Sequence, residues 1–292
     1  MVFQLKLISL KRLIRFFRGG VLNLMARYLV LGGSGYIGSA LVKYLQLQNH
    51  KVDILDIQIS HTQDLTRLKI KNLDEYNACF FLAWNVGGSK YLNDTSTWPN
   101  QFQENIGLIN NIFPQLKLAG IPYLFVSSQL AGMDESPYSL TKFVAEKYCQ
   151  TMPNSVVARQ WNAYGSVERL DVKSHVLSDL IHQAVSRGRI DLLTDGQEKR
   201  KFVHLSDICD AYLSMINFLQ GRIFDVSAGQ YVSILEISEI ISNFTGAKIF
   251  PGIHSGLDPI VKEYETVPNW HPKVSLEVGI LEMINSYKEQ NK

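Results

Sequence analysis

Short runs of consecutive apolar residues recur along the first half of the chain. Five of them are predicted to be buried strands, at residues 27–31, 52–55, 78–83, 123–126 and 156–158. The segments between them are long enough to hold helices, and residues 36–47 carry apolar side chains at helical spacing. Apolar strands that alternate with helices are typical of a parallel sheet covered on both faces.

The second half of the chain alternates less regularly. Residues 174–187, 234–245 and 276–287 are predicted helices, residues 201–218 a strand that leads into a helix, and residues 223–227 a further strand. No internal repeat or obvious linker interrupts these segments. The pattern predicts an α/β fold, namely a Rossmann-type doubly wound parallel sheet of about seven strands. A small C-terminal lobe is expected beside it.

Residues 1–24 differ from the rest because five basic residues alternate with apolar ones and no acidic residue accompanies them. Charges interrupt every apolar run, so the segment reads neither as a secretory signal peptide nor as a membrane-spanning helix. One hypothesis is a basic amphipathic arm that contacts a membrane surface or a partner. We favour the other, an extension upstream of a natural start at Met25.

Composition and charge narrow the class of protein. The 292 residues are 46% hydrophobic and 19% charged, as in ordinary globular proteins. Lys and Arg number 29 against 27 Asp and Glu, a balance that predicts no nucleic-acid partner. The three cysteines, Cys79, Cys149 and Cys209, lie far apart in apolar segments and lack the spacing of a metal site. We expect buried thiols, a reducing cytoplasmic compartment and no bound metal.

Three glycines, Gly32, Gly35 and Gly38, stand directly after the first strand and at the start of its helix. The first permits a tight turn, the second lets the backbone approach a pyrophosphate, and the third allows the helix to pack closely on the strand. A phosphate would lie at the positive N-terminus of the helix. The spacing therefore predicts a dinucleotide site, and the alternative is a turn that binds no ligand.

Asp56 ends the next predicted strand. A carboxylate at this place can accept hydrogen bonds from both ribose hydroxyls and repel a 2′-phosphate, which favours NAD over NADP. The alternative role for Asp56 is to cap the strand end. Asp64 and Leu65 follow and are predicted to lie near the adenine, although an exposed loop aspartate is the competing interpretation.

A second group of polar residues comprises Ser128, which ends the fourth apolar run, and Tyr138 and Lys142 on the helix that follows. Tyr138 and Lys142 are one helical turn apart and share a face. A lysine ammonium beside a phenol is expected to lower the phenol's pKa, so that Tyr138 can exchange a proton with an alcohol or ketone. Ser128 would hydrogen-bond the same oxygen, which makes these three the predicted catalytic residues.

With these motifs the chain resembles the extended short-chain dehydrogenase/reductases, the nucleotide-sugar epimerase and dehydratase group. The resemblance covers nearly everything from Met25 onward. It includes residues 81–84 (Phe-Leu-Ala-Trp) as the third-strand signature, Asn105 in the following helix, and residues 159–165 (Arg-Gln-Trp-Asn-Ala-Tyr-Gly). Residues 196–207 are similar to the stretch whose arginine meets a substrate diphosphate, a role that would fall to Arg200.

The resemblance implies two sets of binding residues and a division of the chain. Contacts to NAD are implied for Gly32, Gly35, Tyr36, Ile37, Gly38, Asp56, Asp64, Leu65, Leu82, Ala83, Tyr138 and Lys142. Contacts to a nucleotide-sugar substrate are implied for Val86, Gly87, Ser128, Gln129, Asn162, His175 and Arg200. Residues 25–163 and 201–227 would form the NAD(P)-binding domain, and residues 164–200 and 228–292 the substrate-binding lobe.

Departures from the family pattern narrow the expected chemistry. Family dehydratases carry an Asp-Glu pair after the catalytic serine or threonine, where this chain has Gln129 and Leu130. Enzymes that epimerise C3 and C5 are similar at Val86-Gly87-Gly88 and Ser174-His175-Val176 but use a cysteine at the position of Gln129. His175 is either a remaining acid or a satisfied surface histidine. Ala131 and Gly132 stand where the family has Tyr-Gly, so the sequence does not define the shape of the substrate pocket.

The favoured function is therefore NAD(P)-dependent reduction of a 4-keto-sugar nucleotide, with Tyr138 as acid and base. The first alternative is an NAD-dependent nucleotide-sugar 4-epimerase that uses the same apparatus. A non-catalytic NAD-binding sensor is the second, because a fold alone never establishes activity. A homodimer through the helices that carry Asn105 and Tyr138 is also expected from the resemblance.

Overall fold

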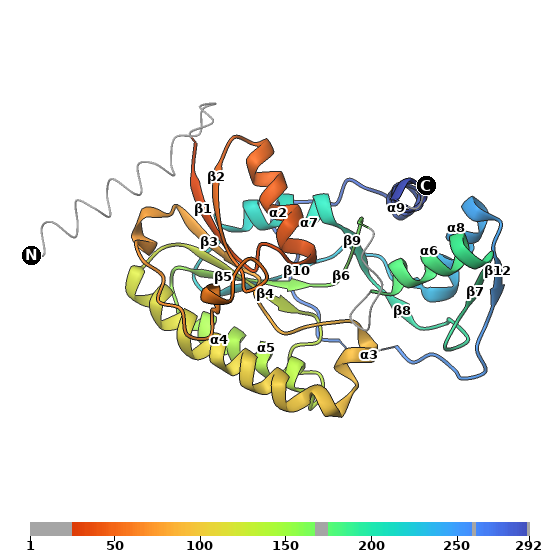
Figure 1. The fold of residues 1–292 in the computed structure, drawn as a ribbon, viewed down its shortest axis with the longest axis horizontal. Helices are drawn as coiled ribbons and strands as arrows, with labels where there is room; N and C mark the ends of the chain where they lie inside the picture. The colour runs from red at the N-terminus through yellow and green to blue at the C-terminus, as the bar shows by residue number, and fades with distance from the viewer. Residues whose placement is uncertain (1–24, 167–174, 259–260, 291–292) are drawn as a thin grey trace, which may run out of the picture.

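The computed structural model describes residues 25–166, 175–258 and 261–290 (Figure 1). The predicted basic extension, residues 1–24, lies outside the described residues, as does Ser174. Six parallel strands form the central sheet, which confirms the predicted fold class. In spatial order they are β2 (Lys51–Leu55), β1 (Arg27–Leu31), β3 (Ala78–Phe81), β4 (Tyr123–Ser128), β5 (Ser155–Gln160) and β10 (Arg222–Val226).

The strand order reverses at β1. Strand β2 pairs with one edge of β1 and strand β3 with the other, in parallel register. In doubly wound sheets a crevice opens outside the carboxyl ends of the strands at such a reversal, and ligands bind there. The ends of β1, β2 and β3 therefore mark the place where a site is expected.

Helices cover both faces of this sheet, as Figure 1 shows. On one face, α2 (Tyr36–Leu47) and α7 (Leu205–Met215) pack on a buried cluster that includes Val30, Leu41 and Phe80. On the other face, α4 (Trp98–Ala119) and α5 (Pro137–Gln150) pack on a cluster that includes Leu29 and Phe113. Strands β3, β4 and β5 are thus buried on both sides, which explains why their apolar runs are continuous rather than alternating.

One expectation about the sheet, its number of strands, is wrong. The predicted strand near residue 201 is β9 (Phe202–His204), which pairs with β6 (Asn162–Tyr164) outside the central sheet, so the sheet has six strands and not about seven. A three-residue run does not encode its partner, and β10 already occupies the edge beside β5. The segment between β2 and β3, residues 57–77, contains the short 3₁₀ helices η1 (His61–Gln63) and η2 (Leu73–Glu75) and no α-helix.

A third hydrophobic cluster lies beyond the central sheet. It is built mainly from α6 (Val176–Arg187), α8 (Ile234–Thr245) and α9 (Leu276–Gln290), which confirms these three predicted helices. Short strand pairs, β7 (Arg189–Asp191) with β12 (Lys248–Phe250) and β8 (Lys199–Arg200) with β11 (Val232–Ser233), accompany them. The remaining short elements are α3 (Ser89–Leu92) and η3 (Thr95–Thr97). The division into a cofactor domain and a substrate lobe stays a prediction.

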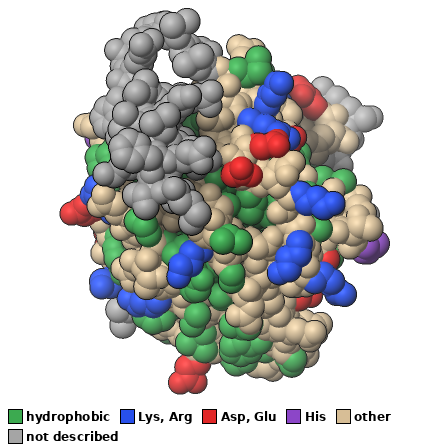
Figure 2. Space-filling model, turned by 90° about the vertical axis from the view of Figure 1, so that its left-hand side faces the viewer, with side chains coloured by type: hydrophobic (Ala, Val, Ile, Leu, Met, Phe, Trp, Pro, Cys, Tyr) green, Lys and Arg blue, Asp and Glu red, His purple; other side chains and the backbone are tan. Residues whose placement is uncertain are grey.

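The surface carries charges of both signs, and the three cysteines are buried. Figure 2 shows a face on which basic and acidic side chains are scattered among apolar ones. Cys79, Cys149 and Cys209 are buried free thiols, as predicted. Within the described residues, no helix is both long and apolar enough to cross a membrane. No group of three or more His, Cys, Asp or Glu side chains there has the arrangement of a metal site.

Candidate active site

A cleft of about 1340 Å³ opens at the carboxyl ends of the central strands. Every site residue predicted from the sequence lines this cleft, together with residues from α6, β7 and β8. The predicted residues that it brings together are Gly32, Gly35, Tyr36, Ile37, Gly38, Asp56, Asp64, Leu65, Leu82, Ala83, Val86, Gly87, Ser128, Gln129, Tyr138, Lys142, Asn162, His175 and Arg200. The cleft thus joins the two predicted halves of the site, while the role of each residue stays a prediction.

The glycine-rich turn after β1 is held by close backbone contacts. Gly32 has φ +85°, a left-handed conformation that favours glycine, and a Cβ there would lie 2.5 Å from the Ala83 amide nitrogen. A Cβ on Gly38 would lie 2.1 Å from the Gly32 carbonyl oxygen. These two glycines are therefore required by the turn itself. Gly35, at the N-cap of α2, has space and faces the cleft.

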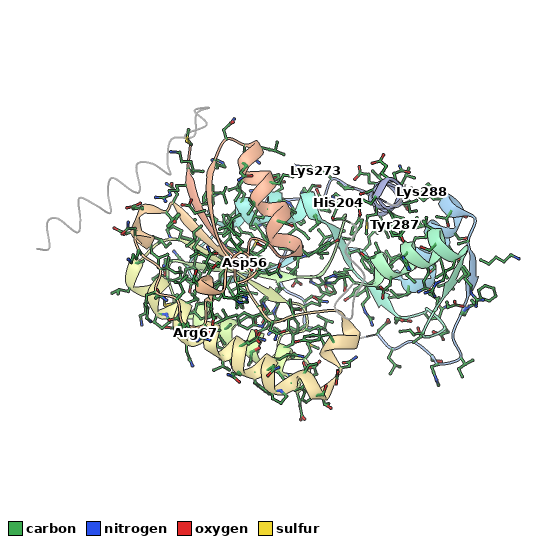
Figure 3. All side chains as sticks on the ribbon, viewed as in Figure 1. Asp56, Arg67, His204, Lys273, Tyr287 and Lys288 are labelled. Atoms are coloured by element: carbon green, nitrogen blue, oxygen red, sulfur yellow. The ribbon has the colours of Figure 1, made fainter. Side chains whose placement is uncertain are left out.

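Asp56 stands at the end of β2, near the centre of the molecule in Figure 3, and is 7% exposed. One carboxylate oxygen accepts a 2.8 Å hydrogen bond from the Ser34 amide, and the other accepts a 2.9 Å bond from the Gln58 amide. Asp56 therefore caps the strand end, and its bond to Ser34 also holds the glycine-rich turn. Because each carboxylate oxygen can accept a second bond, the capping role leaves room for ribose hydroxyls.

Asp64 and Leu65 line the cleft, and their contact with an adenine stays a prediction. The Asp64 carboxylate accepts bonds from the amide and hydroxyl of Thr66 and from Arg67, and the Thr66 hydroxyl bond is the main reason that its pKa is lowered. Leu65 is 4% exposed and packs into the core. Asp64 is thus engaged in its own loop, and it is not a solvated aspartate.

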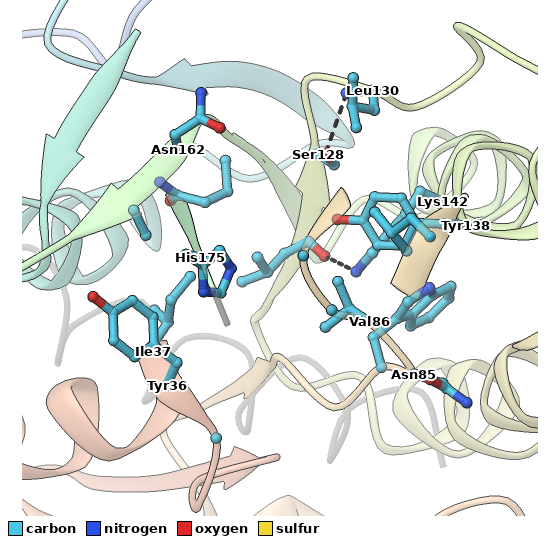
Figure 4. Close-up of a pocket in the computed structure, with 18 of the residues that line it drawn as sticks. Tyr36, Ile37, Asn85, Val86, Ser128, Leu130, Tyr138, Lys142, Asn162 and His175 are labelled. Atoms are coloured by element: carbon cyan, nitrogen blue, oxygen red, sulfur yellow. Dashed lines mark hydrogen bonds between the residues drawn. The ribbon is translucent and has the colours of Figure 1, made fainter. Parts of the chain in front are cut away.

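Ser128, Tyr138 and Lys142 converge at the end of β4. Helix α5 begins at Pro137 after Ser136, whose side chain caps the Ser139 amide, and this start directs Tyr138 and Lys142 at the cleft (Figure 4). Lys142 is 3% exposed, and its Nζ donates a 2.6 Å hydrogen bond to the Val126 carbonyl. Its ammonium also lies 4.1 Å from the centre of the Trp84 ring.

The expected lowering of the Tyr138 pKa by Lys142 is wrong for this arrangement. Burial raises the pKa of the phenol, and a hydrogen bond with the Ser128 side chain opposes this only in part. Burial also lowers the pKa of Lys142 well below its ordinary value. The lysine bonds to Val126 and not to the phenol, so its charge does not offset the desolvation of Tyr138.

The predicted substrate residues surround this group. The Gln129 side-chain oxygen lies 3.3 Å from the Ser128 hydroxyl, which donates to it. The loop of Val86 and Gly87 follows Asn85, whose amide donates to the buried Asn105 side chain at 2.8 Å. Asn105 therefore fixes the position of this loop rather than lining the cleft itself.

Three further predicted residues belong to the opposite wall. The His175 ring stacks on Tyr36 with 5.3 Å between ring centres, and Figure 4 shows this pair across the cleft from Tyr138. The Asn162 side chain donates a 2.9 Å bond to the Lys201 carbonyl. Arg200 is partly buried, and this burial lowers its pKa. A uniformly solvated basic run is excluded, because Lys201 is 6% exposed.

Comparison with known proteins now decides the family. A model of the family described as NAD dependent epimerase/dehydratase matches residues 28–227, more than half of the chain.

The chain belongs to the NAD dependent epimerase/dehydratase family.

Curated relatives of this family match across most of the chain. A protein of Methanocaldococcus jannaschii that carries the provisional name UDP-glucose 4-epimerase is 26% identical and covers 90% of this chain and 99% of its own length. The dTDP-4-dehydro-6-deoxyglucose reductase of Escherichia coli is 21% identical and covers 89% and 97%. The solved UDP-glucose 4-epimerase of Thermotoga maritima, 19% identical, covers 91% and 100% with a TM-score of 0.73 and shares the fold.

Family membership makes this chain an NAD-dependent enzyme of the short-chain dehydrogenase/reductase type. The described residues fit the cofactor. Gly35, which has no side chain, lines the cleft at the N-terminus of α2, where a phosphate is favoured, and the Asp56 carboxylate lines the same cleft. When bound, NAD supplies or accepts the hydride.

Two residues of the cleft, Trp84 and Gln160, make contacts that the sequence did not indicate. Trp84 stood only as part of a strand motif, yet its ring faces the Lys142 ammonium. Gln160 is 6% exposed, lines the cleft and accepts a 2.7 Å bond from the Tyr212 hydroxyl of α7. A polar residue at the end of an apolar run was the available signal for Gln160. Trp84 had none, because an aromatic residue after a strand usually belongs to the core.

Proposed function

We propose that this enzyme reduces the 4-keto group of a nucleotide-activated sugar with NADH. Tyr138 donates its hydroxyl proton to the ketone oxygen, Ser128 hydrogen-bonds the same oxygen, and Lys142 holds the ribose that carries the nicotinamide. Bound NADH would supply the hydride for the ketone carbon, so that an alcohol and NAD⁺ would be the products. Burial raises the pKa of Tyr138, so the phenol holds the proton that this step needs at neutral pH.

The observation that carries the proposal is Gln129. Its carboxamide oxygen accepts from the Ser128 hydroxyl at 3.3 Å, at the position where elimination or deprotonation would need a base. A carboxamide does not accept a proton at neutral pH. Hydride transfer with proton exchange at Tyr138 is therefore the chemistry that the described groups support.

The 4-epimerase is the second candidate. It would oxidise the 4-hydroxyl, present the other face of the ketone and reduce it again on retained NAD. Asp56 supports this candidate only against an NADPH-dependent reductase, because a buried carboxylate that binds the ribose would suit NAD. The sensor hypothesis is disfavoured, because Ser128, Tyr138 and Lys142 are all present and together in the cleft.

Native mass spectrometry of the gently desalted protein separates the two enzymes. The reductase is expected to lose its cofactor on desalting and to oxidise added NADH in the presence of dTDP-4-dehydro-6-deoxyglucose, followed at 340 nm. The epimerase is expected to retain NAD and to convert UDP-glucose to its C4 epimer without added cofactor. Retained NAD with no NADH oxidation would overturn the reductase assignment.

We further propose a homodimer formed by α4 and α5. These helices pack together, and apolar side chains remain exposed on them: Phe102 (39%), Leu140 (39%), Phe143 (37%) and Val144 (48%). Leu140, Phe143 and Val144 are spaced as neighbours on one face of α5. A face of this kind is typical of a helix that buries its apolar stripe against another copy.

A charge at this face should separate the subunits. Val144→Arg is expected to convert the dimer to a monomer in size-exclusion chromatography with light scattering, because an arginine would be buried without a partner. Leu118→Arg is the control, since Leu118 lies near the end of α4 and is 90% exposed. A wild-type protein that is monomeric at micromolar concentration would overturn the dimer.

A further inference from the structure

Three successive residues of β4 make polar contacts with three residues of α5 spaced four apart. The contacts are Val126 carbonyl with Lys142 Nζ at 2.6 Å, Ser127 hydroxyl with Glu146 at 2.6 Å, and Ser128 hydroxyl with the Tyr138 phenol. Residues four apart share one face of a helix. The helix that carries Tyr138 and Lys142 is thus fixed along the strand end by a third contact, that of Glu146.

Glu146 also binds a neighbouring strand. Arg159 of β5 donates to both of its carboxylate oxygens at 2.8 Å, and the two side chains are 1% and 2% exposed. Ser127 and Arg159 are register partners on adjacent strands. Glu146 therefore joins α5 to a paired position of β4 and β5. Arg159 also donates to the Ala131 carbonyl at 3.2 Å, in the loop that follows Gln129.

Within the described residues, groups of α5 and of the neighbouring strands act on Lys142. On α5 they are Tyr138, Glu146 and the buried thiol of Cys149, and from the strand side they are the Val126 carbonyl and the rings of Phe125 and Trp84. Arg159 faces Glu146. On the side of β5 away from β4, the register partner of Arg159 is Asp225 of β10. Glu146 is the carboxylate that raises the pKa of Lys142 against the effect of burial.

We propose that Glu146, clamped by Arg159, is a positioning residue for hydride transfer: it holds α5 in register with β4 and β5 and keeps the Lys142 amine in its charged form. This inference rests on the proposed roles of Tyr138 and Lys142. Glu146 and Arg159 do not line the cleft, so they act through the residues that do.

The test uses the charge of Lys142 directly and needs no substrate. Acetylation of Lys142 by dilute acetic anhydride is followed from pH 6 to 11 by peptide mass spectrometry on the intact folded protein, with the exposed Lys147 of the same helix as internal reference. In Glu146→Gln the midpoint for Lys142 is expected to fall by about one pH unit, because an opposite charge is lost. The midpoint for Lys147 should stay unchanged.

Activity should follow this shift. The amine must be charged, so turnover is present below the pKa of Lys142 and is lost as the pH rises through it. A lowered pKa therefore moves the alkaline limb of kcat to lower pH, and kcat is expected to fall about tenfold or more while KM changes little. Glu239→Gln, an exposed exchange on α8, is the matched control and should leave both profiles unchanged.

A second variant tests whether misfolding explains the result. Glu146→Gln alone leaves the Arg159 guanidinium buried without its carboxylate, which could disturb the fold. Glu146→Gln combined with Arg159→Gln removes both charges and should lower the Lys142 midpoint in the same direction but by less, because no uncompensated cation remains nearby. A wild-type midpoint in either variant, with native near-UV circular dichroism, overturns the inference. If the Lys142 midpoint shifts in these variants but the wild-type enzyme never oxidises NADH, the proposed reductase is overturned. The positioning role of Glu146 then still stands.

Discussion

Tyr138→Phe is expected to reduce kcat by about 10²–10⁴-fold, the usual contribution of a positioned general acid. The substitution removes one oxygen, which bonds to Ser128, and leaves the ring packed, since Tyr138 is 8% exposed. Burial raises the pKa of this phenol, so the phenol stays protonated at neutral pH. The variant should therefore fold normally and lack only the proton that the ketone oxygen needs. Stopped-flow measurement of NADH oxidation checks the loss.

Cofactor binding is the control for this variant. NADH fluorescence titration should give the same dissociation constant within about twofold, because the phenol hydroxyl contributes to the transition state more than to ground-state binding. Tyr148→Phe, on the same helix but outside the cleft, should leave turnover unchanged. Unchanged turnover in Tyr138→Phe would remove this residue from the mechanism.

The glycine-rich turn gives the second large effect, and the structure separates two of its positions. Gly35→Ala is expected to fold with an unchanged melting temperature, because the new Cβ would meet only the Gly32 carbonyl at 3.5 Å. Its methyl group would stand in the cleft where the backbone approaches the pyrophosphate. We expect NAD affinity to fall by about tenfold or more, a loss of roughly 1.4 kcal/mol, measured by calorimetric titration.

Gly38→Ala should instead damage the fold. A Cβ there would lie 2.1 Å from the Gly32 carbonyl, so the helix or the turn must shift. Such overpacking typically costs about 1–3 kcal/mol, and urea unfolding measures it as a lower midpoint. If Gly35→Ala and Gly38→Ala lost stability equally, the separation into a ligand-facing and a packing glycine would be wrong.

Local patterns in the sequence predicted most of the elements. The helix at residues 234–245 coincides with α8, and the apolar runs became β2, β3, β4 and β5. Both patterns act within a few residues, so a linear reading finds them. The residues chosen for the site also proved to line one cleft, because strand ends of a parallel sheet meet at one edge.

The partners of the short strand β9 and the course of residues 57–77 could not be predicted in the same way. The position of β9 depends on β6 and β10, which are far from it in the chain. In residues 57–77 Leu65 and Leu73 enter the core, and side chains of α4 bond to the backbone of this segment. Tertiary packing, and not local propensity, decides such segments.

By itself the sequence determined the type of fold, the dinucleotide turn and the chemical identity of Ser128, Tyr138 and Lys142, because these follow from residue type and spacing. Only the tertiary structure decided how these groups behave. Burial raises the pKa of Tyr138, the Val126 carbonyl takes the hydrogen bond of Lys142, and Arg159 from another strand meets Glu146. Desolvation and ion pairing depend on everything packed around a group, and that environment is assembled from residues far apart in the chain.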